Sequence, residues 1–350
     1  MVYLGDKATG RDNNLNLIRM IAASAVLVSH AFPIALGPDA VQPLETALGH
    51  TLGTLAVFAF FAISGFLITA SFERSSSLTS FLAARFLRLY PALIVSLLLV
   101  AFGIAPWVSS LAPADFIATS APWKFMVRNL ALISPMYVLP TVFDTNPYTA
   151  IEGSIWTLFY EVMCYTAIFL AGVAGIWRNR RLAAGVLLLY FALWLAAGAF
   201  DIGMHPKLRS LLNLSLPFAI GTAFYLWKDR LPLHFGLFLG LAALTWISKG
   251  SFAYTFMLCL ALSYGVFWFA YMPGGILRAY NRLGDYSYGI YIYAFPLQGL
   301  AVWLFGPQSP VENMLYAFPM TLLAAVLSWH FIEDPALRAK SRVVGWLKPA

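Results

Sequence analysis

Long apolar stretches alternate along the chain with short polar connections rich in Gly, Pro, Lys and Arg. A helix that crosses a membrane needs about 20 mostly apolar residues. Ten stretches satisfy that requirement, at 15–36, 51–72, 86–106, 153–177, 182–200, 209–227, 231–248, 252–272, 284–305 and 312–332. The pattern predicts an all-α polytopic membrane protein, a bundle of about ten transmembrane helices.

The connection 107–152 is longer than the others and rich in proline. It predicts a long outer loop or a re-entrant segment, since its middle, around 125–143, is apolar enough to enter the membrane surface. Whether it holds an extra membrane segment stays open. We find no internal repeat and no appended soluble domain, and the polar start before residue 15 favours an anchor over a removable signal peptide. The whole chain, 1–350, is therefore expected to form a single transmembrane domain.

The composition excludes several classes of protein. Hydrophobic residues make up 61% and charged residues 11% of the chain, with a mean hydropathy of +0.76. Soluble domains carry about 25% charged residues, because their surfaces face water. A soluble globular protein, a disordered chain and a nucleic-acid-binding protein are thus excluded. Cys164 and Cys259 both lie within apolar runs, so they predict neither a disulfide framework nor a metal site.

The distribution of Lys and Arg predicts the orientation. With ten spans and an inner N-terminus, sixteen of the 22 basic residues lie in inner connections, five in outer ones, and Arg19 within the first span. Cytoplasmic loops of membrane proteins carry this excess of Lys and Arg. Both termini are therefore predicted to be cytoplasmic, and the net charge of +7 reflects orientation rather than binding of nucleic acid.

Ionisable residues inside predicted spans are candidate functional groups, because each costs at least ~2.5–3.5 kcal/mol at the membrane centre. His30 lies roughly 22 Å along the first span, and Glu161 enters the fourth span to a depth of about 9 Å, so both reach the outer half. Arg19, Arg85 and Arg88 gather at the inner end. Arg85 and Arg88 share a helical face, which suits a phosphate-rich ligand that arrives from the cytoplasm.

Each of these residues also has a purely structural interpretation. Arginines at the edge of a span often extend toward the membrane surface as anchors. A lone His30 is more often a packing residue than a catalyst, and Glu161 is able simply to neutralise an arginine. Small polar residues such as Ser64 and Ser154 are more often helix-packing contacts than ligand contacts.

Taken together, six segments resemble the signatures of the acyltransferase-3 family of integral membrane O-acyltransferases. The similarity covers nearly the whole chain in order, in segments 16–30, 60–68, 85–91, 154–161, 283–291 and 331–335. The segment 85–91 matches the family's Arg-x-x-Arg-hydrophobic-x-Pro signature, and 154–161 is similar to its Ser-Leu-Trp-Thr-Leu-x-x-Glu signature. Two positions depart from the pattern: Asn16 stands where the family has Asp, and Ala294 where it has a late His.

The resemblance implies an enzyme that transfers an acetyl or other short acyl group from cytoplasmic acyl-CoA to a hydroxyl of an extracytoplasmic or lipid-linked glycan. Its donor-binding residues would be Arg19, Arg85 and Arg88, and no metal is expected. Histidine is the side chain best suited to remove a hydroxyl proton near neutral pH. His30 is therefore the predicted general base, and Glu161 the carboxylate that orients or neutralises its imidazole.

Ser64, Ser154 and Trp156 are predicted to contact the acceptor. The expected partners are membrane lipid, acyl-CoA (acetyl-CoA first), the glycan acceptor and proteins of glycan assembly, with no nucleic acid. The expected location is a bacterial cytoplasmic (inner) membrane, in polysaccharide biosynthesis. Two alternatives remain from other classes: a transporter or flippase of a glycan or lipid-linked intermediate, and a non-catalytic membrane scaffold.

Overall fold

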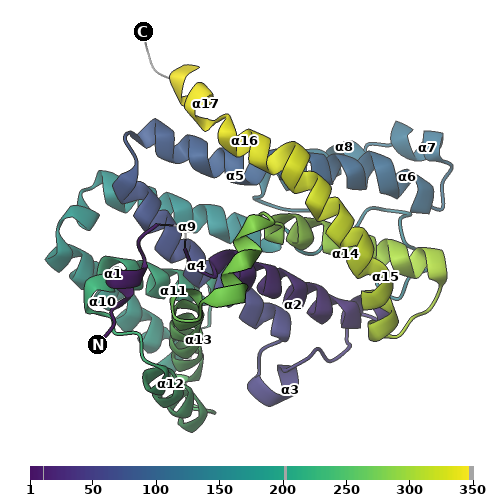
Figure 1. The fold of residues 1–350 in the computed structure, drawn as a ribbon. Coiled ribbons are helices and arrows are strands. Elements are labelled where there is room, and N and C mark those ends of the chain that lie inside the picture. The colour runs from purple at the N-terminus through teal and green to yellow at the C-terminus, as the bar shows by residue number, and fades with distance from the viewer. Residues whose placement is uncertain (11, 201–202, 347–350) are drawn as a thin grey trace. The chain divides into compact units, whose positions relative to one another are not determined.

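The computed structural model describes residues 1–10, 12–200 and 203–346, and it is built of helices and loops (Figure 1). In that part of the chain there is no strand, only two isolated β-bridges. The all-α membrane architecture predicted from the sequence is confirmed. Arg11 and Lys348, two of the basic residues used for the predicted orientation, lie outside the described residues.

The chain divides into two compact units. The first comprises Met1–Arg19, Val57–Ser75 and Tyr160–Leu283, and the second comprises Met20–Ala56, Ser76–Phe159 and Gly284–Ala350. We call them unit 1 and unit 2. The helices α2 (Leu15–Leu36), α4 (Leu52–Arg74) and α9 (Trp156–Val173) contribute residues to both units.

The other helices belong to one unit each. Those of unit 1 are α1 (Leu4–Lys7), η2 (Ile176–Arg178), α10 (Arg180–Ala199), α11 (Pro206–Leu226), η3 (Lys228–Arg230), α12 (Phe235–Ile247), α13 (Tyr254–Tyr271) and η4 (Gly275–Arg282). Those of unit 2 are α3 (Glu45–Leu48), α5 (Leu78–Leu98), η1 (Leu99–Ile104), α6 (Ala105–Val108), α7 (Pro113–Ala118), α8 (Ala121–Ala131), α14 (Ser287–Phe305), α15 (Pro310–Ser328), η5 (Trp329–Glu333), α16 (Asp334–Arg338) and α17 (Lys340–Trp346).

Every predicted span contains a helix, and eight of these helices in the described residues are long and apolar enough to cross a membrane. The two others are α11, whose first turns carry Lys207 and Arg209, and α12, which has only 13 residues. A helix of that length extends about 20 Å, less than the roughly 30 Å of a bilayer core. The count of ten spans and the cytoplasmic location of the termini therefore stay predictions.

The long connection 107–152 holds short helices rather than a spanning one, the longest being α8 with 11 residues. Residues 132–155, which follow α8, are irregular, and several of their side chains, including Leu139, Phe143 and Ile151, are fully buried in unit 2. An irregular backbone at membrane depth is tolerated where protein surrounds it. This segment therefore brings side chains into the core of unit 2.

The third helical region begins earlier than the predicted span at 86–106. Ser77 caps α5, because its Oγ accepts a hydrogen bond from the Ser80 N–H at 3.1 Å. Such a cap satisfies one of the N–H groups that a helix start leaves unpaired. Arg85 and Arg88 consequently lie in the second and third turns of α5, not at its first residues.

Glycines set the closest helix packing in each unit. In unit 1, a Cβ at Gly65 of α4 would collide with the Phe218 carbonyl of α11, and a Cβ at Gly221 of α11 would collide with the Ala62 carbonyl of α4. In unit 2, α14 and α15 pack along each other, and a Cβ at Gly289 would lie 2.7 Å from the Cα of Ala325. Small residues allow helix backbones in membranes to approach this closely.

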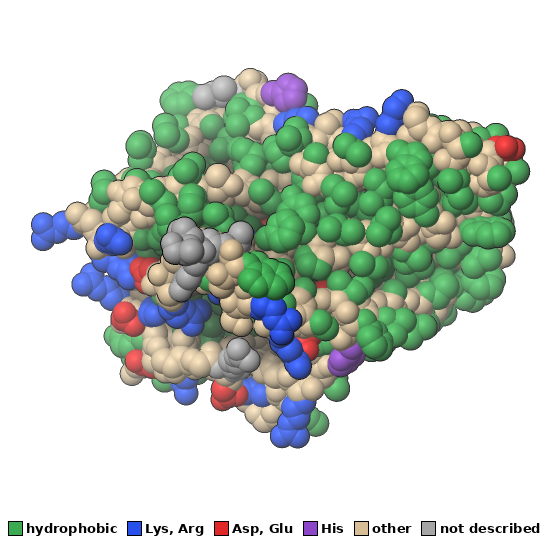
Figure 2. Space-filling model, turned by 90° about the horizontal axis from the view of Figure 1, so that it is seen from above, with side chains coloured by type: hydrophobic (Ala, Val, Ile, Leu, Met, Phe, Trp, Pro, Cys, Tyr) green, Lys and Arg blue, Asp and Glu red, His purple; other side chains and the backbone are tan. Residues whose placement is uncertain are grey.

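Large apolar side chains remain exposed on the outward surfaces of these helices. Leu188 of α10, Leu315 of α15 and Phe331 of η5 are 68%, 67% and 74% exposed. Hydrophobic side chains cover much of the face shown in Figure 2. Soluble monomers rarely expose so much contiguous apolar surface, so this surface fits contact with lipid. The protein is a multi-pass membrane protein.

Candidate active site

His30 lies on α2 in unit 2, with its ring edge-on against Phe295 of α14. The ring centroids are 5.2 Å apart and the planes cross at 77°. The side chain keeps partial exposure, but its Nδ1 atom is buried and has no hydrogen-bond partner. A buried imidazole nitrogen of this kind is available to a ligand. The neighbouring Ser29 already has a partner, because the Ser29 hydroxyl donates a hydrogen bond to the Gln42 Oε1 at 2.6 Å.

An amide network holds α2 beside α14 at the level of His30. The Gln298 side-chain amide of α14 donates to the Leu27 carbonyl at 2.9 Å, one turn before His30. The same nitrogen donates to the Asn313 Oδ1 of α15 at 3.1 Å, and the Asn313 amide in turn donates to the Gln308 Oε1. Buried networks with most members paired fix the relative positions of their helices. Gln298 therefore helps to place His30.

Residues 152–154, just before α9, pack against the same aromatic ring. A Cβ at Gly153 would collide with the ring of Phe295. The Ser154 carbonyl accepts a hydrogen bond from the Tyr291 hydroxyl at 2.7 Å, and that hydroxyl also lies 2.5 Å from the Thr157 Oγ1. The predicted acceptor residue Ser154 thus precedes the helix rather than lying within it.

Glu152 is fully buried and lies just before α9. Its Oε1 atom accepts hydrogen bonds from the N–H groups of Gly153 and Ser154, each at 3.0 Å, while its Oε2 atom is buried without a partner. Burial raises the pKa of the Glu152 carboxyl to about 8, although these N–H groups act to lower it. The carboxyl group is therefore mostly neutral at pH 7.

Sequence reasoning did not select Glu152 as a site residue. It precedes the predicted fourth span by one residue, where an acidic side chain fits an ordinary outer loop. The sequence around Glu152 did carry one sign that the residue is buried: it follows the apolar residues Ala150 and Ile151 and directly precedes a glycine and a helix start. Trp156, which was selected, is 36% exposed and opens α9.

The arginine pair of α5 lies elsewhere in unit 2, where it meets two carboxylates. The Arg88 guanidinium lies 2.7 Å from the Asp285 Oδ2 and 3.6 Å from the Glu333 Oε2. The other oxygen of each carboxylate is also used: Asp285 Oδ1 accepts from the Ser287 hydroxyl at 2.5 Å, and Glu333 Oε1 from the Ser328 hydroxyl at 3.0 Å. We call Arg88, Asp285 and Glu333 the ion cluster.

The ion cluster joins three of the signature segments recognised in the sequence. Arg88 belongs to 85–91, Asp285 to 283–291 and Glu333 to 331–335. Glu333 ends the π-helical turn η5, and such turns inside longer helices often occur at functional positions. Arg88 therefore ties α5 to the start of α14 and to the end of the α15 region. Arg85 extends over the Phe81 ring, with 5.9 Å between its guanidinium carbon and the ring centroid.

In unit 1, the structure brings Ser64 and Glu161 together. The Glu161 Oε1 accepts hydrogen bonds from the Ser64 hydroxyl of α4, at 3.4 Å, and from the Tyr165 hydroxyl one turn along α9. Tyr165 was missed by sequence reasoning, although its i+4 spacing from Glu161 places both on one helical face. Arg19, the last residue of unit 1 on α2, is partly exposed.

The eight predicted site residues are thus divided between the units. Unit 2 holds His30, Arg85, Arg88, Ser154 and Trp156, and unit 1 holds Arg19, Ser64 and Glu161. His30 and Ser154 lie around one aromatic ring. The predicted pairing of His30 with Glu161 joins residues of different units and stays a prediction.

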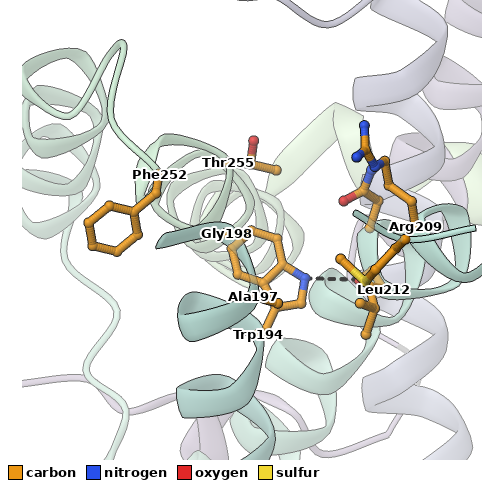
Figure 3. A pocket seen from close by; sticks show the side chains of 9 residues that line it. Trp194, Ala197, Gly198, Arg209, Leu212, Phe252 and Thr255 are labelled. Carbon is orange, nitrogen blue, oxygen red and sulfur yellow. Dashed lines mark hydrogen bonds between the residues drawn. The ribbon is translucent and has the colours of Figure 1, made fainter. Parts of the chain in front are cut away.

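A pocket of about 220 Å³ lies in unit 1 between the end of α10 and the starts of α11 and α13 (Figure 3). Its wall includes Trp194, Arg209 and Phe252, and the Trp194 indole N–H donates to the Leu212 carbonyl at 3.1 Å. None of its nine lining residues is a histidine or a carboxylate, and none is a predicted site residue. The pocket lacks the groups that acyl transfer requires.

Among the described residues, no three His, Cys, Asp or Glu side chains are grouped so that they could hold a metal ion.

Comparison with known proteins identifies the class of enzyme. The family model described as an acyltransferase domain matches residues 12–333. The chain belongs to this acyltransferase family. It is 29% identical to an O-acetyl transferase of Shigella phage Sf6, over 95% of this chain and 98% of the relative. It is 28% identical to Nodulation protein 10 of Rhizobium leguminosarum bv. viciae, over 97% of each chain.

A third relative is the acyltransferase MdmB of Streptomyces mycarofaciens, 27% identical over 72% of this chain and 63% of the relative. No solved structure matches the chain. The resemblance recognised in the sequence is confirmed, and the protein is a membrane O-acyltransferase that uses an acyl donor.

Proposed function

We propose that this acyltransferase transfers an acetyl group from cytoplasmic acetyl-CoA to a hydroxyl of an extracytoplasmic or lipid-linked glycan, in a bacterial inner membrane. Family membership over residues 12–333 carries the reaction class. The name of the phage relative, O-acetyl transferase, favours acetyl as the group and a hydroxyl as the acceptor. Glycans outside the membrane suit an enzyme whose predicted base lies in the outer half of the first span.

His30 acts as the general base in this proposal. A sugar hydroxyl is a weak nucleophile at neutral pH, and a positioned base typically contributes about 10²–10⁴-fold to the rate. The buried Nδ1 of His30 has no protein partner, so it is free to accept the hydroxyl proton. Packing against Phe295 and the amide contact at Leu27 limit the positions of the ring and of its helix.

In this proposal the acetyl group passes directly from the thioester to the acceptor hydroxyl. The acceptor oxygen attacks the thioester carbonyl carbon, a C–O bond forms, and the C–S bond breaks. The hydroxyl proton passes to His30 and then to the sulfur of the departing coenzyme A. Glu161 stabilises the imidazolium that forms between these steps, as a carboxylate does in hydrolase triads.

The donor's phosphates are bound by arginines at the inner end of the spans, Arg19, Arg85 and Arg88. Guanidinium groups bind phosphate through paired N–H donors. Arg88 also contacts Asp285 and Glu333, so in this proposal it both binds the donor and links helices of unit 2. Ser64, Ser154 and Trp156 are the proposed contacts of the acceptor.

The proposal is tested by mass spectrometry of the surface glycans of cells with the gene, without it, and with the His30→Ala variant. We expect an acetyl ester on one glycan only in cells with the unaltered chain. Identical glycans in the three strains, at equal protein abundance, would contradict the proposal. A flippase would instead change the amount of exported glycan and leave its acylation unaltered.

A further inference from the structure

Near Phe295 in unit 2, the segments of α2, α14 and the start of α9 carry four buried polar atoms without a hydrogen-bond partner: His30 Nδ1, Glu152 Oε2, Ser154 Oγ and Gln298 Oε1. Glu152, Ser154 and Gln298 have no exposed surface at all. Folded proteins rarely leave buried polar atoms unpaired, because the loss of water must be compensated by another partner. Four such atoms on segments that meet at one aromatic ring therefore point to a ligand that supplies the missing hydrogen bonds.

The segments that carry these residues meet at Phe295. The His30 ring contacts the Phe295 ring, and the backbone at Gly153, between Glu152 and Ser154, is pressed against the same ring. Gln298 lies one turn further along α14. It reaches α2 one turn before His30, through the Leu27 carbonyl.

A second group of contacts confirms that the same segments meet. Ile34, one turn after His30, packs in one apolar cluster with Ala150, Phe295 and Val302. Helix α2, the segment before α9 and helix α14 thus converge here. Of the four residues with an unpaired buried atom, His30 alone is partly exposed.

The side chains of these four residues indicate which kind of ligand they would bind. The group contains a carboxyl, a hydroxyl, an amide oxygen and an imidazole, and none of its members is Lys or Arg. Phosphates and carboxylates are bound by cationic side chains, whereas neutral sugars present several neighbouring hydroxyls that both donate and accept. The uncharged part of a glycan fits this group, and the anionic end of coenzyme A does not.

We propose that Glu152, Ser154 and Gln298 form, beside His30, the subsite that binds the hydroxyl groups of the acceptor sugar. This inference rests on the proposed function and adds Glu152 and Gln298 to the acceptor contacts expected from the sequence. Glu152 Oε1 is held by two backbone N–H groups, so its Oε2 is fixed in position and faces the ligand. The hydroxyl that reacts lies at His30, and its neighbours are held by the other three side chains.

The pKa of Glu152 supports this role. Because burial raises that pKa to about 8, the carboxyl group carries a proton at neutral pH. A neutral carboxyl group both donates and accepts hydrogen bonds, as a sugar hydroxyl requires. A neutral sugar also leaves no unpaired charge in the buried subsite.

The test is steady-state kinetics of purified protein in lipid nanodiscs, with labelled acetyl-CoA as donor and alkali-deacylated surface polysaccharide of the source organism as acceptor. We expect Ser154→Ala and Glu152→Ala to raise the KM for the polysaccharide about tenfold, the usual effect of losing one hydrogen bond to a ligand. The KM for acetyl-CoA stays unchanged. Glu152→Gln keeps an oxygen that accepts from the Gly153 and Ser154 N–H groups and supplies an N–H donor, so it retains most of the acceptor affinity.

Two controls separate binding from folding. Glu312→Ala removes a glutamate that caps α15 and whose carboxylate accepts from Ser309, and it should change neither KM. Ser154→Ala removes a hydroxyl that has no protein partner, so the folded protein should keep its melting temperature. Ser154→Ala therefore tests the subsite even where Glu152→Ala fails to fold.

An unchanged acceptor KM in folded Ser154→Ala, and in Glu152→Ala where that variant folds, together with wild-type transfer, would overturn the subsite and leave the proposed function intact; a buried water would then satisfy these atoms. Equal increases in both KM values would overturn it as well. If the unaltered protein acetylates no polysaccharide, the proposed function itself fails.

Discussion

Unit 2 contains two polar regions that differ in how far their groups are paired. In the ion cluster, Arg88 contacts Asp285 and Glu333, and the serines at positions 287 and 328 occupy further carboxylate oxygens. Around Phe295, by contrast, four residues each leave a buried polar atom without a partner. Paired groups stabilise a fold, whereas unpaired groups in a rigid setting are ready for a ligand. The difference supports the proposal that the chemistry takes place near His30, and it predicts that the ion cluster contributes to stability.

The largest effect is expected from His30→Ala. Loss of the base should lower the rate of acetyl transfer by about 10²–10⁴-fold. Because Nδ1 has no protein partner, the protein should fold and insert normally. The transfer rate and the melting temperature are measured on the same preparation. A folded variant with the full rate would remove His30 from the chemistry.

Arg88→Met should act on stability before it acts on catalysis. Breaking a buried ion pair by removing one partner costs about 3–5 kcal/mol, since the remaining charges stay buried. The buried carboxylates of Asp285 and Glu333 would lose the Arg88 guanidinium, and the abundance of folded protein should fall steeply. Thermal unfolding and membrane yield measure this loss.

The matched control for that variant is Arg338→Met, which removes an exposed arginine paired with Asp334. Exposed pairs contribute about 0–1 kcal/mol, so this control should fold like the wild type. A stable Arg88→Met protein would contradict the stabilising role, and an unchanged KM for acetyl-CoA in that protein would remove Arg88 from the proposed donor contacts.

Arg85→Gln should give a smaller and different effect. We expect the KM for acetyl-CoA to rise about tenfold, as for loss of a hydrogen bond to a charged group, with little change in the melting temperature. The KM of Arg85→Lys for acetyl-CoA should lie between those of Arg85→Gln and the wild type, because lysine keeps the positive charge but lacks the planar guanidinium group. An unchanged KM would favour the alternative in which Arg85 only anchors α5 at the membrane surface.

The smallest effect concerns the pH dependence of stability at Glu152. Its pKa is raised to about 8 in the folded protein from an ordinary value of 4.5. Between these values the unfolded chain has released the proton and the folded chain keeps it, so this group's contribution to stability is lost as the pH rises from about 4.5 to 8.

Glu152→Gln does not titrate and should escape this loss. The melting temperature of the wild type relative to the variant should therefore fall as the pH rises from 5 to 8. Comparing the two proteins at each pH cancels most contributions of other groups. A difference that is independent of pH would mean that the carboxyl group is ionised in the folded state.

The helices were largely predictable from the sequence, because long apolar runs determine them directly. The start of α5 was placed too late, although Ser77 in a run of serines is a recognisable cap. His30 and the arginine pair were found because ionisable groups within apolar runs are conspicuous. The partners of Arg88 were not found, since Asp285 is 197 residues away along the chain.

Glu152 shows a different limit of sequence reasoning. Its burial depends on the packing of α14 against an irregular loop, and irregular loops have no periodicity to reveal which side faces inward. The same loop was expected to be an outer connection or a re-entrant segment, and several of its side chains enter the core of unit 2.

Acetyl transfer by the purified protein tests the central claim most directly. Protein in sealed liposomes receives labelled acetyl-CoA on one side and deacylated polysaccharide on the other, and the base-labile label on the polysaccharide is measured for wild type and His30→Ala. The account predicts ester-linked label with the wild type and at least a hundredfold slower labelling with the folded variant, about the lower limit for loss of a general base. Label that stays on coenzyme A with the wild type, or equal labelling by both proteins, would contradict it.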